Sequence, residues 1–302
     1  MNALVVGHGS IGARHARILE EEGCAVGVVS GRPGPKVRFE TLADGLEQHA
    51  PLYVVVANRT ADHKTTIHAL ASAGYTGRVL VEKPLFSSLS PLPQHQFQSL
   101  HVAYNLRFHP VLRALHGAIE GHRVLSVQAY AGQYLPNWRT GRNYRDSYSA
   151  DRTQGGGVLR DLSHEFDYLG WLLGPWIRAT ALGGHLSPLK IDSEDVAVVL
   201  AAYAACPAVS VHLNYLDRPG RRRVVINTDE ATFEADIARG TLHEGEKTEV
   251  FPMDPDDTYR AQHRALLSGE GGGACTAPEA LDTLALVEAA EASLAHPQWV
   301  VR

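Results

Sequence analysis

Residues 3–12 read ALVVGHGSIG, an apolar run that leads directly into three glycines at the spacing G-x-G-x-x-G. At this spacing Gly7 permits a tight turn from a strand into a helix, Gly9 lets backbone amides approach a pyrophosphate, and Gly12 lets the helix pack closely on the strand. The N-terminus of that helix then faces the phosphate charge. Because a strand-like run precedes the motif and a helical stretch follows it, we predict a dinucleotide-binding turn rather than a plain glycine turn.

The first third of the chain has the pattern of a parallel α/β sheet. Its apolar runs alternate with helix-length segments, and they occupy residues 3–6, 25–29, 53–57 and 79–81. The spacing predicts one strand for each run. We therefore predict a dinucleotide-binding domain over residues 1–105.

The remaining two thirds have a different pattern. Several apolar runs are close neighbours joined by turn residues, which indicates a largely antiparallel sheet; they occupy residues 125–131, 196–203, 208–213, 223–227 and 232–236. Helices are predicted over 158–173 and 278–295. Since 302 residues are long for a single core, we predict a second α/β domain over residues 106–302, with its C-terminal helix a candidate to pack back on the first domain.

The composition is typical of a globular protein, with 44% hydrophobic and 20% charged residues. No apolar run is long enough to span a bilayer, and no charged leader precedes the first strand, so we expect a cytoplasmic protein without a membrane partner. The net charge of -5 argues against nucleic-acid binding. The dense basic run at residues 221–223 is interpreted as a solvated hairpin edge rather than an anion site.

The cysteines and histidines do not form recognisable metal or disulfide patterns. The three cysteines are odd in number and far apart, which suggests neither a disulfide framework nor a C-x-x-C site. Among sixteen histidines no pair has a convincing metal spacing, and His164-Glu165 lacks the second histidine of H-E-x-x-H. We therefore predict that the chain binds no metal.

The end of the second predicted strand indicates which dinucleotide is bound. An NAD site usually carries Asp or Glu about 20 residues beyond the glycine motif, to hold the ribose 2′-hydroxyl. Residues 23–39 contain no acid, and Ser30 and Arg32 stand there instead. A hydroxyl and a guanidinium suit a 2′-phosphate. We expect NADP(H) to be favoured over NAD(H), the alternative being an ordinary polar loop.

Two further stretches carry groups suited to catalysis. Lys83 follows the strand-like run 79–81 directly, at the edge where open α/β sheets bind ligands, although a plain surface cation would look the same. On a helix over 158–173, Asp161, His164 and Tyr168 would share one face. A histidine beside a carboxylate suits proton exchange near neutral pH, whereas the bland interpretation is a solvated helix face.

Taken in order, these motifs resemble one family. The stretches GHGSIGARH, VLVEKPL, AYNLRFHP and GGGVLRDLSHEFDYLGWLLG are similar to those of the glucose-fructose oxidoreductase, inositol dehydrogenase and MocA (Gfo/Idh/MocA) family. The resemblance covers nearly the whole chain. It implies an N-terminal Rossmann domain and a C-terminal substrate-binding α/β domain whose open sheet often forms an oligomer interface, so we expect a homodimer or homotetramer.

The resemblance also implies roles for particular residues. Lys83 would lie near the nicotinamide after a cis Lys-Pro bond, and His164 would serve as acid/base; the family's aspartate usually stands four residues before that histidine, whereas Asp161 stands three before it. The cofactor-binding residues are expected to be Gly7, His8, Gly9, Ser10, Ile11, Gly12, Ser30, Arg32, Ala57, Asn58, His63, Glu82 and Lys83.

The segment 133–150 is similar to a substrate loop in members associated with surface-sugar biosynthesis. Its aromatic rings can stack on a sugar or base, and its arginines can neutralise a phosphate or carboxylate. The alternative is a mobile loop that packs its aromatics against the domain interface. The substrate candidates are Tyr104, Arg107, Tyr134, Trp138, Arg139, Tyr144, Tyr148 and Tyr168. Arg107, at the expected domain junction, could equally be structural.

These observations favour an NAD(P)-dependent oxidoreductase acting on a small molecule. It would transfer hydride between nicotinamide and a carbinol or keto carbon of a sugar or sugar derivative, nucleotide-linked or acidic. One alternative is a reductase of an imine, an enone or a linear tetrapyrrole. Another is a dinucleotide-binding sensor without turnover, which would have no chemical use for Lys83, Asp161 and His164 together.

Overall fold

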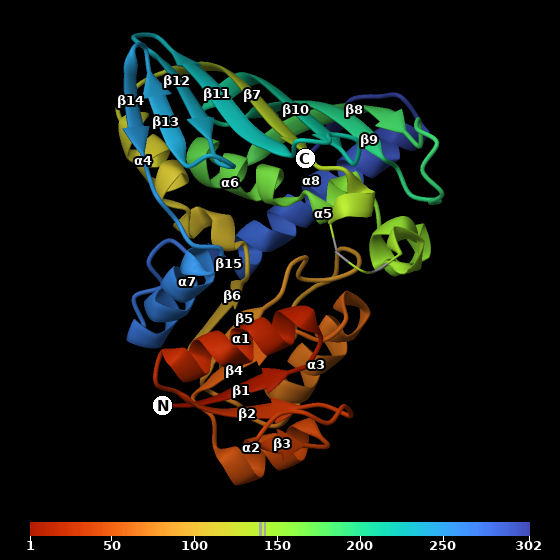
Figure 1. Cartoon of the computed structure of the whole chain (residues 1–302), viewed down its shortest axis with the longest axis vertical. Coiled ribbons are helices and arrows are strands. Elements are labelled where there is room, and N and C mark those ends of the chain that lie inside the picture. Colours follow the sequence, from red (N-terminus) through yellow and green to blue (C-terminus); the bar gives the residue numbers. More distant parts are fainter. Residues whose placement is uncertain (139–140, 142) are drawn as a thin grey trace. The chain divides into compact units, whose positions relative to one another are not determined.

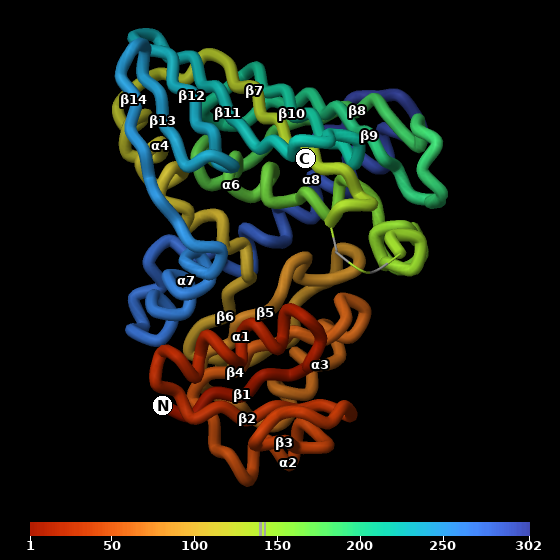
Figure 2. Tube along the Cα trace, in the orientation of Figure 1, coloured from red at the N-terminus to blue at the C-terminus, as the bar shows by residue number. Residues whose placement is uncertain are grey.

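The structure is a computed structural model that describes residues 1–138, 141 and 143–302. It divides into two compact units (Figures 1 and 2). The first comprises Met1–Phe108 and Asp254–Leu281, and the second comprises His109–Met253 and Asp282–Arg302. The sequence analysis assigned residues 254–281 to the second domain, whereas in the structure they pack within the first unit.

The first unit is built on a mainly parallel sheet. Within the described residues it has seven strands in the order β15-β6-β5-β4-β1-β2-β3, all pairs being parallel except β15 with β6. The strands are β1 (Asn2–Val6), β2 (Ala25–Val29), β3 (Arg38–Phe39), β4 (Tyr53–Val56), β5 (Arg78–Val81), β6 (Ser99–Val102) and β15 (Cys275–Thr276). The central strand β1 is the one that leads into the glycine motif.

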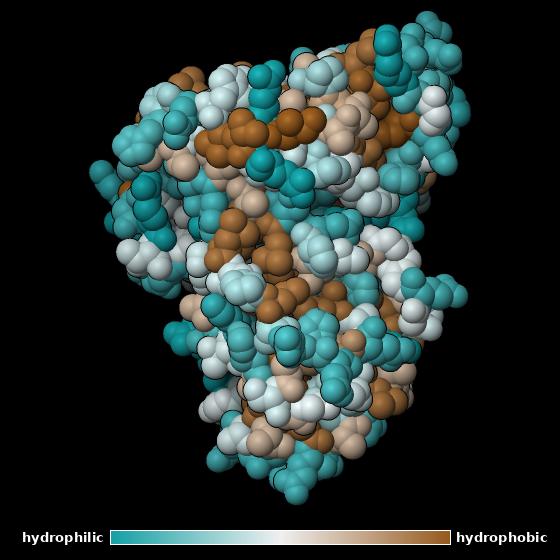
Figure 3. Space-filling view, turned by 180° about the vertical axis from the view of Figure 1, so that it is seen from behind, coloured by the Kyte–Doolittle hydropathy of each residue, from teal (hydrophilic) through white to brown (hydrophobic). Residues whose placement is uncertain are grey.

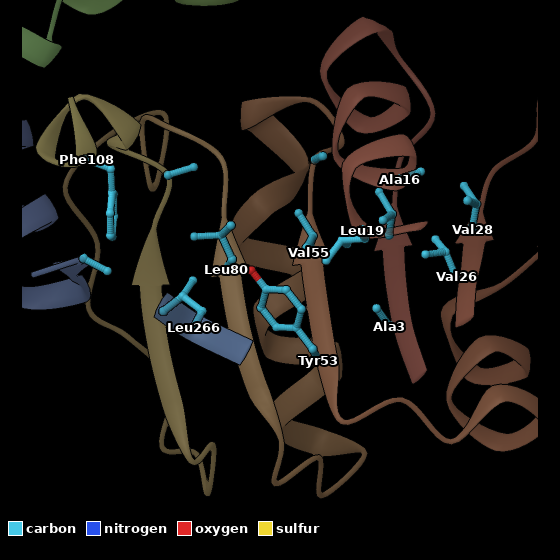
Figure 4. Packing of buried hydrophobic residues seen from close by; sticks show 14 residues of the cluster. Ala3, Ala16, Leu19, Val26, Val28, Tyr53, Val55, Leu80, Phe108 and Leu266 are labelled. Atoms are coloured by element: carbon cyan, nitrogen blue, oxygen red, sulfur yellow. The ribbon is translucent and has the colours of Figure 1, made fainter. Parts of the chain in front are cut away.

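Helices pack on both faces of this sheet. They are α1 (Ser10–Glu21), α2 (Leu42–His49), α3 (Thr60–Ser72) and α7 (Asp257–Ser268). On one face, side chains of α1 and α7, among them Leu19 and Leu266, join Val5, Tyr53 and Val55 in one buried cluster (Figure 4). Leu4 points to the opposite face, where it meets α2. Burial on both faces explains why the strands are continuous apolar runs.

The second unit is built on a largely antiparallel sheet. In the part of the chain that the structure describes, nine strands follow the order β14-β13-β12-β11-β7-β10-β9-β8-β16, with only β7 and β10 parallel. The strands are β7 (Val124–Gly132), β8 (Trp176–Gly184), β9 (Val196–Tyr203), β10 (Cys206–Asn214), β11 (Arg221–Thr228), β12 (Thr232–Asp236), β13 (Thr241–Glu244), β14 (Lys247–Val250) and β16 (Val300–Val301).

The helices of the second unit gather on one face of its sheet (Figure 1). They are α4 (Pro110–Ala118), α5 (Val158–Asp161), α6 (His164–Leu173) and most of α8 (Ala277–Ala295), whose first residues belong to the first unit. Strand residues alternate between burial under these helices and partial exposure, as Ala197, Val199 and Ala201 alternate with Val198 and Leu200. Apolar side chains therefore reach the surface of this unit (Figure 3).

The single helix expected over 158–173 is interrupted. The first segment, α5, ends at Asp161, and α6 begins at His164, with Leu162 and Ser163 forming a turn between them. The helical spacing used to group Asp161 with His164 therefore does not hold along one continuous helix. A search of the described residues found no helix long and apolar enough to cross a membrane.

Candidate active site

The glycine turn joins β1 to α1 as the motif predicts. Gly7 has a φ of +102°, and a Cβ added there would lie 2.6 Å from the backbone nitrogen of Asn58. A Cβ on Gly12 would collide with the carbonyl oxygen of Gly7. Both glycines are thus required by the packing of the first unit itself.

Gly9 is different, because no described atom lies within 4 Å of a Cβ built there. It occupies the N-cap of α1, where no described side chain caps the helix and no acid stands in the first turn. The backbone amides of this turn and the positive end of the helix dipole can therefore act on an anion placed over Gly9. The turn fits the pyrophosphate of a dinucleotide.

The end of β2 carries a polar turn with two arginines. The Oγ atom of Ser30 accepts a hydrogen bond from the backbone nitrogen of Arg32 at 2.9 Å, and Arg32 is exposed. Arg38 was not a predicted site residue, yet its Nη1 atom donates to the Ser30 carbonyl at 3.1 Å. Because β3 pairs with β2, the register brings Arg38 beside this turn. The Nη2 atom of Arg38 also lies 3.7 Å from Oε1 of the exposed Glu40, which follows β3.

Beyond β4, Asn58 and His63 lie inside the unit. The Nδ2 atom of Asn58 donates to Thr66 at 2.8 Å. The Nδ1 atom of His63 lies 3.1 and 3.2 Å from the carbonyl oxygens of Pro84 and Leu85, and the ring is 1% exposed. Burial lowers the pKa of His63, so the ring is neutral near pH 7 and anchors the loop that follows Lys83. Its predicted contact with a cofactor stays a prediction.

Lys83 stands two residues after β5, at the carboxyl edge of the parallel sheet. The Lys83–Pro84 peptide is cis, as the resemblance implied. Glu82 precedes it and uses both carboxylate oxygens: Oε2 accepts the backbone N–H of Lys83 at 3.2 Å, and Oε1 lies 2.8 Å from Nε2 of His15. The lysine is thus placed by a loop that is bonded to two other parts of the unit, α1 and α3.

In the second unit, the glycine run 155–157 leads into α5. Gly157 has a φ of +121°, and a Cβ added there would collide with the carboxylate of Glu194. Glu194 Oε1 instead accepts the backbone N–H of Leu159 at 3.2 Å, at the start of the helix. Burial raises the pKa of Glu194.

The three candidate site residues of the α5–α6 segment have different surroundings. Asp161 is buried, and its Oδ2 atom accepts a hydrogen bond from the hydroxyl of Tyr215 at 2.7 Å. His164 is half-buried at the start of α6. Tyr168 is completely buried, and its hydroxyl forms no hydrogen bond with any described residue. Burial, with Glu165 nearby, raises the pKa of Tyr168. This burial does not favour its predicted contact with substrate.

The candidates near residue 105 are also buried. Tyr104 is 1% exposed, and the Arg107 side chain is 3% exposed with its Nη1 atom 2.9 Å from Oε1 of Glu279. Glu279 also accepts the backbone N–H of Thr276, at the start of α8. Arg107 therefore has a structural partner inside the first unit, and its role toward a substrate stays a prediction.

The predicted substrate loop lines an open pocket of about 350 Å³ within the second unit. Its lining includes Trp138, Asn143, Tyr144, Asp146 and Ser147. The ring of Trp138 packs edge-on against Tyr215 at 5.2 Å, and Tyr215 in turn holds Asp161. Of the other candidates, Tyr134 lies under the guanidinium of Arg218 and Tyr148 is 41% exposed. Arg139 lies outside the described residues.

Known proteins share parts of this sequence pattern and this fold. Residues 118–234 match the family model described as the GFO/IDH/MocA C-terminal domain. The C-terminal domain is of the Gfo/Idh/MocA type. This confirms the resemblance seen in the sequence motifs. No curated protein matches the chain. Within the described residues, no group of three or more His, Cys, Asp or Glu side chains could hold a metal ion.

Solved structures of low sequence identity share the fold over 100% of this chain. An oxidoreductase from Agrobacterium radiobacter, in complex with NAD+, L-tartaric acid and magnesium, is 18% identical with a TM-score of 0.81, and 98% of it is covered. The WlbA dehydrogenase from Bordetella pertussis, in complex with NADH and UDP-GlcNAcA, is 20% identical with a TM-score of 0.79 and 98% covered. A levoglucosan dehydrogenase, in complex with NADH, is 16% identical with a TM-score of 0.83 and 98% covered.

The structure adds residues to the candidate site that the sequence analysis missed. Arg38 and Tyr215 reach their partners only through strand pairing and the packing of a loop, and no local pattern marks them. His15 stood inside the stretch GHGSIGARH and Glu194 just before the predicted strand 196–203, but their partners are 67 and 35 residues away. A short basic run, Lys36-Val37-Arg38, is the one signal that could have suggested a role for Arg38.

Proposed function

We propose that the chain is an NAD(P)-dependent oxidoreductase that transfers hydride to or from a carbinol or keto carbon of a sugar or sugar derivative. The observation that carries this proposal is in the first unit, where one sheet edge holds both the glycine turn and Lys83. Ligands bind at this edge in open parallel sheets. NAD+ or NADH is bound in the similar structures, and a nucleotide-linked sugar in one of them, which supports the same chemistry here.

In the proposed reaction the bound nicotinamide supplies the hydride acceptor or donor. Lys83 holds the substrate oxygen and stabilises the negative charge that develops on it. His164 takes the hydroxyl proton when an alcohol is oxidised and returns it when a ketone is reduced. Asp161, fixed by Tyr215, contributes a negative charge to the same segment as His164, and we propose that it favours the charged imidazolium.

The preference for NADP(H) is proposed from the turn after β2. Arg38 places its guanidinium beside Ser30, and Arg32 is bonded to the same serine through its backbone nitrogen and has an exposed side chain. Arginine suits a phosphate because its planar fork can donate two hydrogen bonds. Changing either arginine to alanine should weaken NADPH binding about tenfold and leave NADH binding nearly unchanged, because a lost charged hydrogen bond amounts to about 1.5 kcal/mol or more. Titration of each variant with both reduced dinucleotides measures this; equal losses for both would contradict the assignment.

The pocket of the loop 133–150 is proposed to take the sugar or its nucleotide. Trp138 and Tyr144 offer rings for stacking on a sugar or base, and the loop's arginines, including Arg139, are proposed to meet a phosphate or carboxylate. We also propose a homodimer or homotetramer through the face of the second unit's sheet that its helices leave open, where Leu200 and Leu182 are 46% and 74% exposed. Light scattering after gel filtration measures the assembly.

The proposed activity is tested by following the absorbance of the reduced nicotinamide with pooled sugars, keto-sugars and nucleotide sugars. Lys83→Ala should lower kcat about a hundredfold or more while the dinucleotide Kd changes little, because the lost interaction forms mainly in the transition state. Lys247→Ala, in the exposed strand β14, is the matched control. Near-normal turnover by Lys83→Ala would contradict the role of Lys83, and silence of the wild type over every pool would contradict the substrate class.

A further inference from the structure

A chain of hydrogen bonds runs through the interior of the first unit from Glu82 to Tyr53. Glu82 Oε1 lies 2.8 Å from Nε2 of His15, Nδ1 of His15 lies 2.8 Å from Nε2 of His263, and Nδ1 of His263 lies 3.0 Å from the hydroxyl of Tyr53. His15, His263 and Tyr53 are completely buried. They come from α1, α7 and β4, so only the packed unit brings them together.

The chemistry of these groups gives the chain one direction. An ionised carboxylate only accepts hydrogen bonds, so Nε2 of His15 carries a hydrogen. The Tyr53 hydroxyl has no other hydrogen-bond partner among the described residues. Its hydrogen is therefore satisfied only when it points at Nδ1 of His263. His263 then carries its own hydrogen on Nε2 and donates it to Nδ1 of His15.

The opposite direction would leave one group unsatisfied. If His15 donated from Nδ1, His263 would accept on Nε2 and donate from Nδ1 to the Tyr53 oxygen. The hydroxyl hydrogen of Tyr53 would then be buried among the apolar side chains seen around its ring in Figure 4. Burial lowers the pKa of His263 well below its usual value, which agrees with a neutral ring.

The two ends of the chain differ in kind. Tyr53 ends in the apolar core, so the chain does not lead a proton to solvent. Glu82 uses its second oxygen to accept the backbone N–H of Lys83. At the other side, His15 lies on α1, the helix that begins at the glycine turn, and its ring packs edge-on against His263 at 4.9 Å and Tyr259 at 5.7 Å, both from α7. These hydrogen bonds thus connect α1, the helix that follows the glycine turn, with the loop that carries Lys83.

We infer that His15 and His263 are positioning residues that hold the Glu82 carboxylate through a one-way chain of neutral Nε2–H imidazoles and thereby fix the backbone at Lys83. The effect on turnover rests on the proposed function of Lys83. The direction of the chain does not, because it follows from the bonding capacities of the groups. A measurement without substrate can therefore test the direction of the hydrogen bonds independently of the proposed function of Lys83.

The first measurement is nitrogen NMR of the whole protein with isotopically labelled histidine rings, at neutral pH and without ligand. Both His15 and His263 are expected as neutral Nε2–H tautomers. A hydrogen on Nδ1 of either ring would overturn the inference, whether or not the wild type turns over any substrate. Signals are assigned from the variants of the two positions.

The second measurement compares His263→Gln with His263→Leu. Glutamine can accept from Tyr53 and donate to His15, so it preserves the direction of the chain, whereas leucine of similar size can do neither. Glu82 should keep the hydrogen on Nε2 of His15 in both variants. The Nδ1 signal of His15 should keep the shift of a hydrogen-bonded acceptor in the glutamine variant and move to that of a free acceptor in the leucine variant, because leucine offers no donor. In a turnover assay the leucine variant should lower kcat about tenfold, with the dinucleotide Kd within about twofold, and the glutamine variant should recover most of the loss. Identical spectra and rates in the two variants would overturn the inference.

Discussion

Two of the glycine-rich turns precede helices that are proposed to serve the reaction, α1 and α5, and they need glycine for different reasons. At the first, Gly7 and Gly12 meet neighbouring backbone, while the space over Gly9 is clear of described atoms. At the second, the Glu194 carboxylate occupies the space over Gly157. A glycine run before a helix is therefore not in itself an anion site: the first turn is proposed to receive a ligand's charge, and the second already holds the protein's own carboxylate.

The largest expected effect is on the second turn. Gly157→Ala would combine a positive φ with a collision against Glu194, and we expect it to lower the free energy of unfolding by about 3 kcal/mol. Urea unfolding measures the loss. The double variant Gly157→Ala/Glu194→Ala should be less destabilised than the sum of the two single variants, because it removes the collision. Simple additivity would show that Glu194 is not the reason for glycine here.

Gly9→Ala tests the first turn. We expect the free energy of unfolding to change by less than about 1 kcal/mol, because the added methyl meets no described atom. The dinucleotide Kd should rise about tenfold, since the methyl occupies the approach to the backbone amides. Calorimetric titration with NADPH and NADH measures this. An unchanged Kd would show that the two turns do not differ in the way proposed.

The smallest expected effect is a pH dependence that belongs to the second turn alone. Burial raises the pKa of Glu194 in the folded protein. As the pH rises above the ordinary pKa of a glutamate, the unfolded chain therefore loses this proton before the folded protein does. The contribution of Glu194 to stability therefore falls as the pH rises from about 4.5 to its folded pKa and is constant above it. Glu194→Gln keeps an acceptor for Leu159 and should gain stability relative to the wild type across that range. A difference independent of pH would contradict the burial effect.

Much of the first unit follows from local pattern. The run before Gly7, the strands β2 and β4 and the cis peptide at Lys83 correspond to expectations drawn from the sequence and its family resemblance. These features depend on a few adjacent residues. The second unit is less predictable from local pattern. The buried and exposed residues of β8 do not alternate strictly, and the turn at 162–163 divides a stretch whose apolar spacing is helical throughout.

The sequence by itself determined the glycine turn between β1 and α1 and placed Lys83 at a strand end, because glycine conformation and strand length act within a few residues. The packed structure decided which distant side chains meet. His15 and His263 are separated by 248 residues, and Asp161 and Tyr215 by 54. Arg38 reaches Ser30 because β3 pairs with β2. Glu194 reaches Gly157 from the connection between β8 and β9. Such contacts depend on strand pairing and burial across the whole unit, so the spacing of residues along the sequence does not predict them.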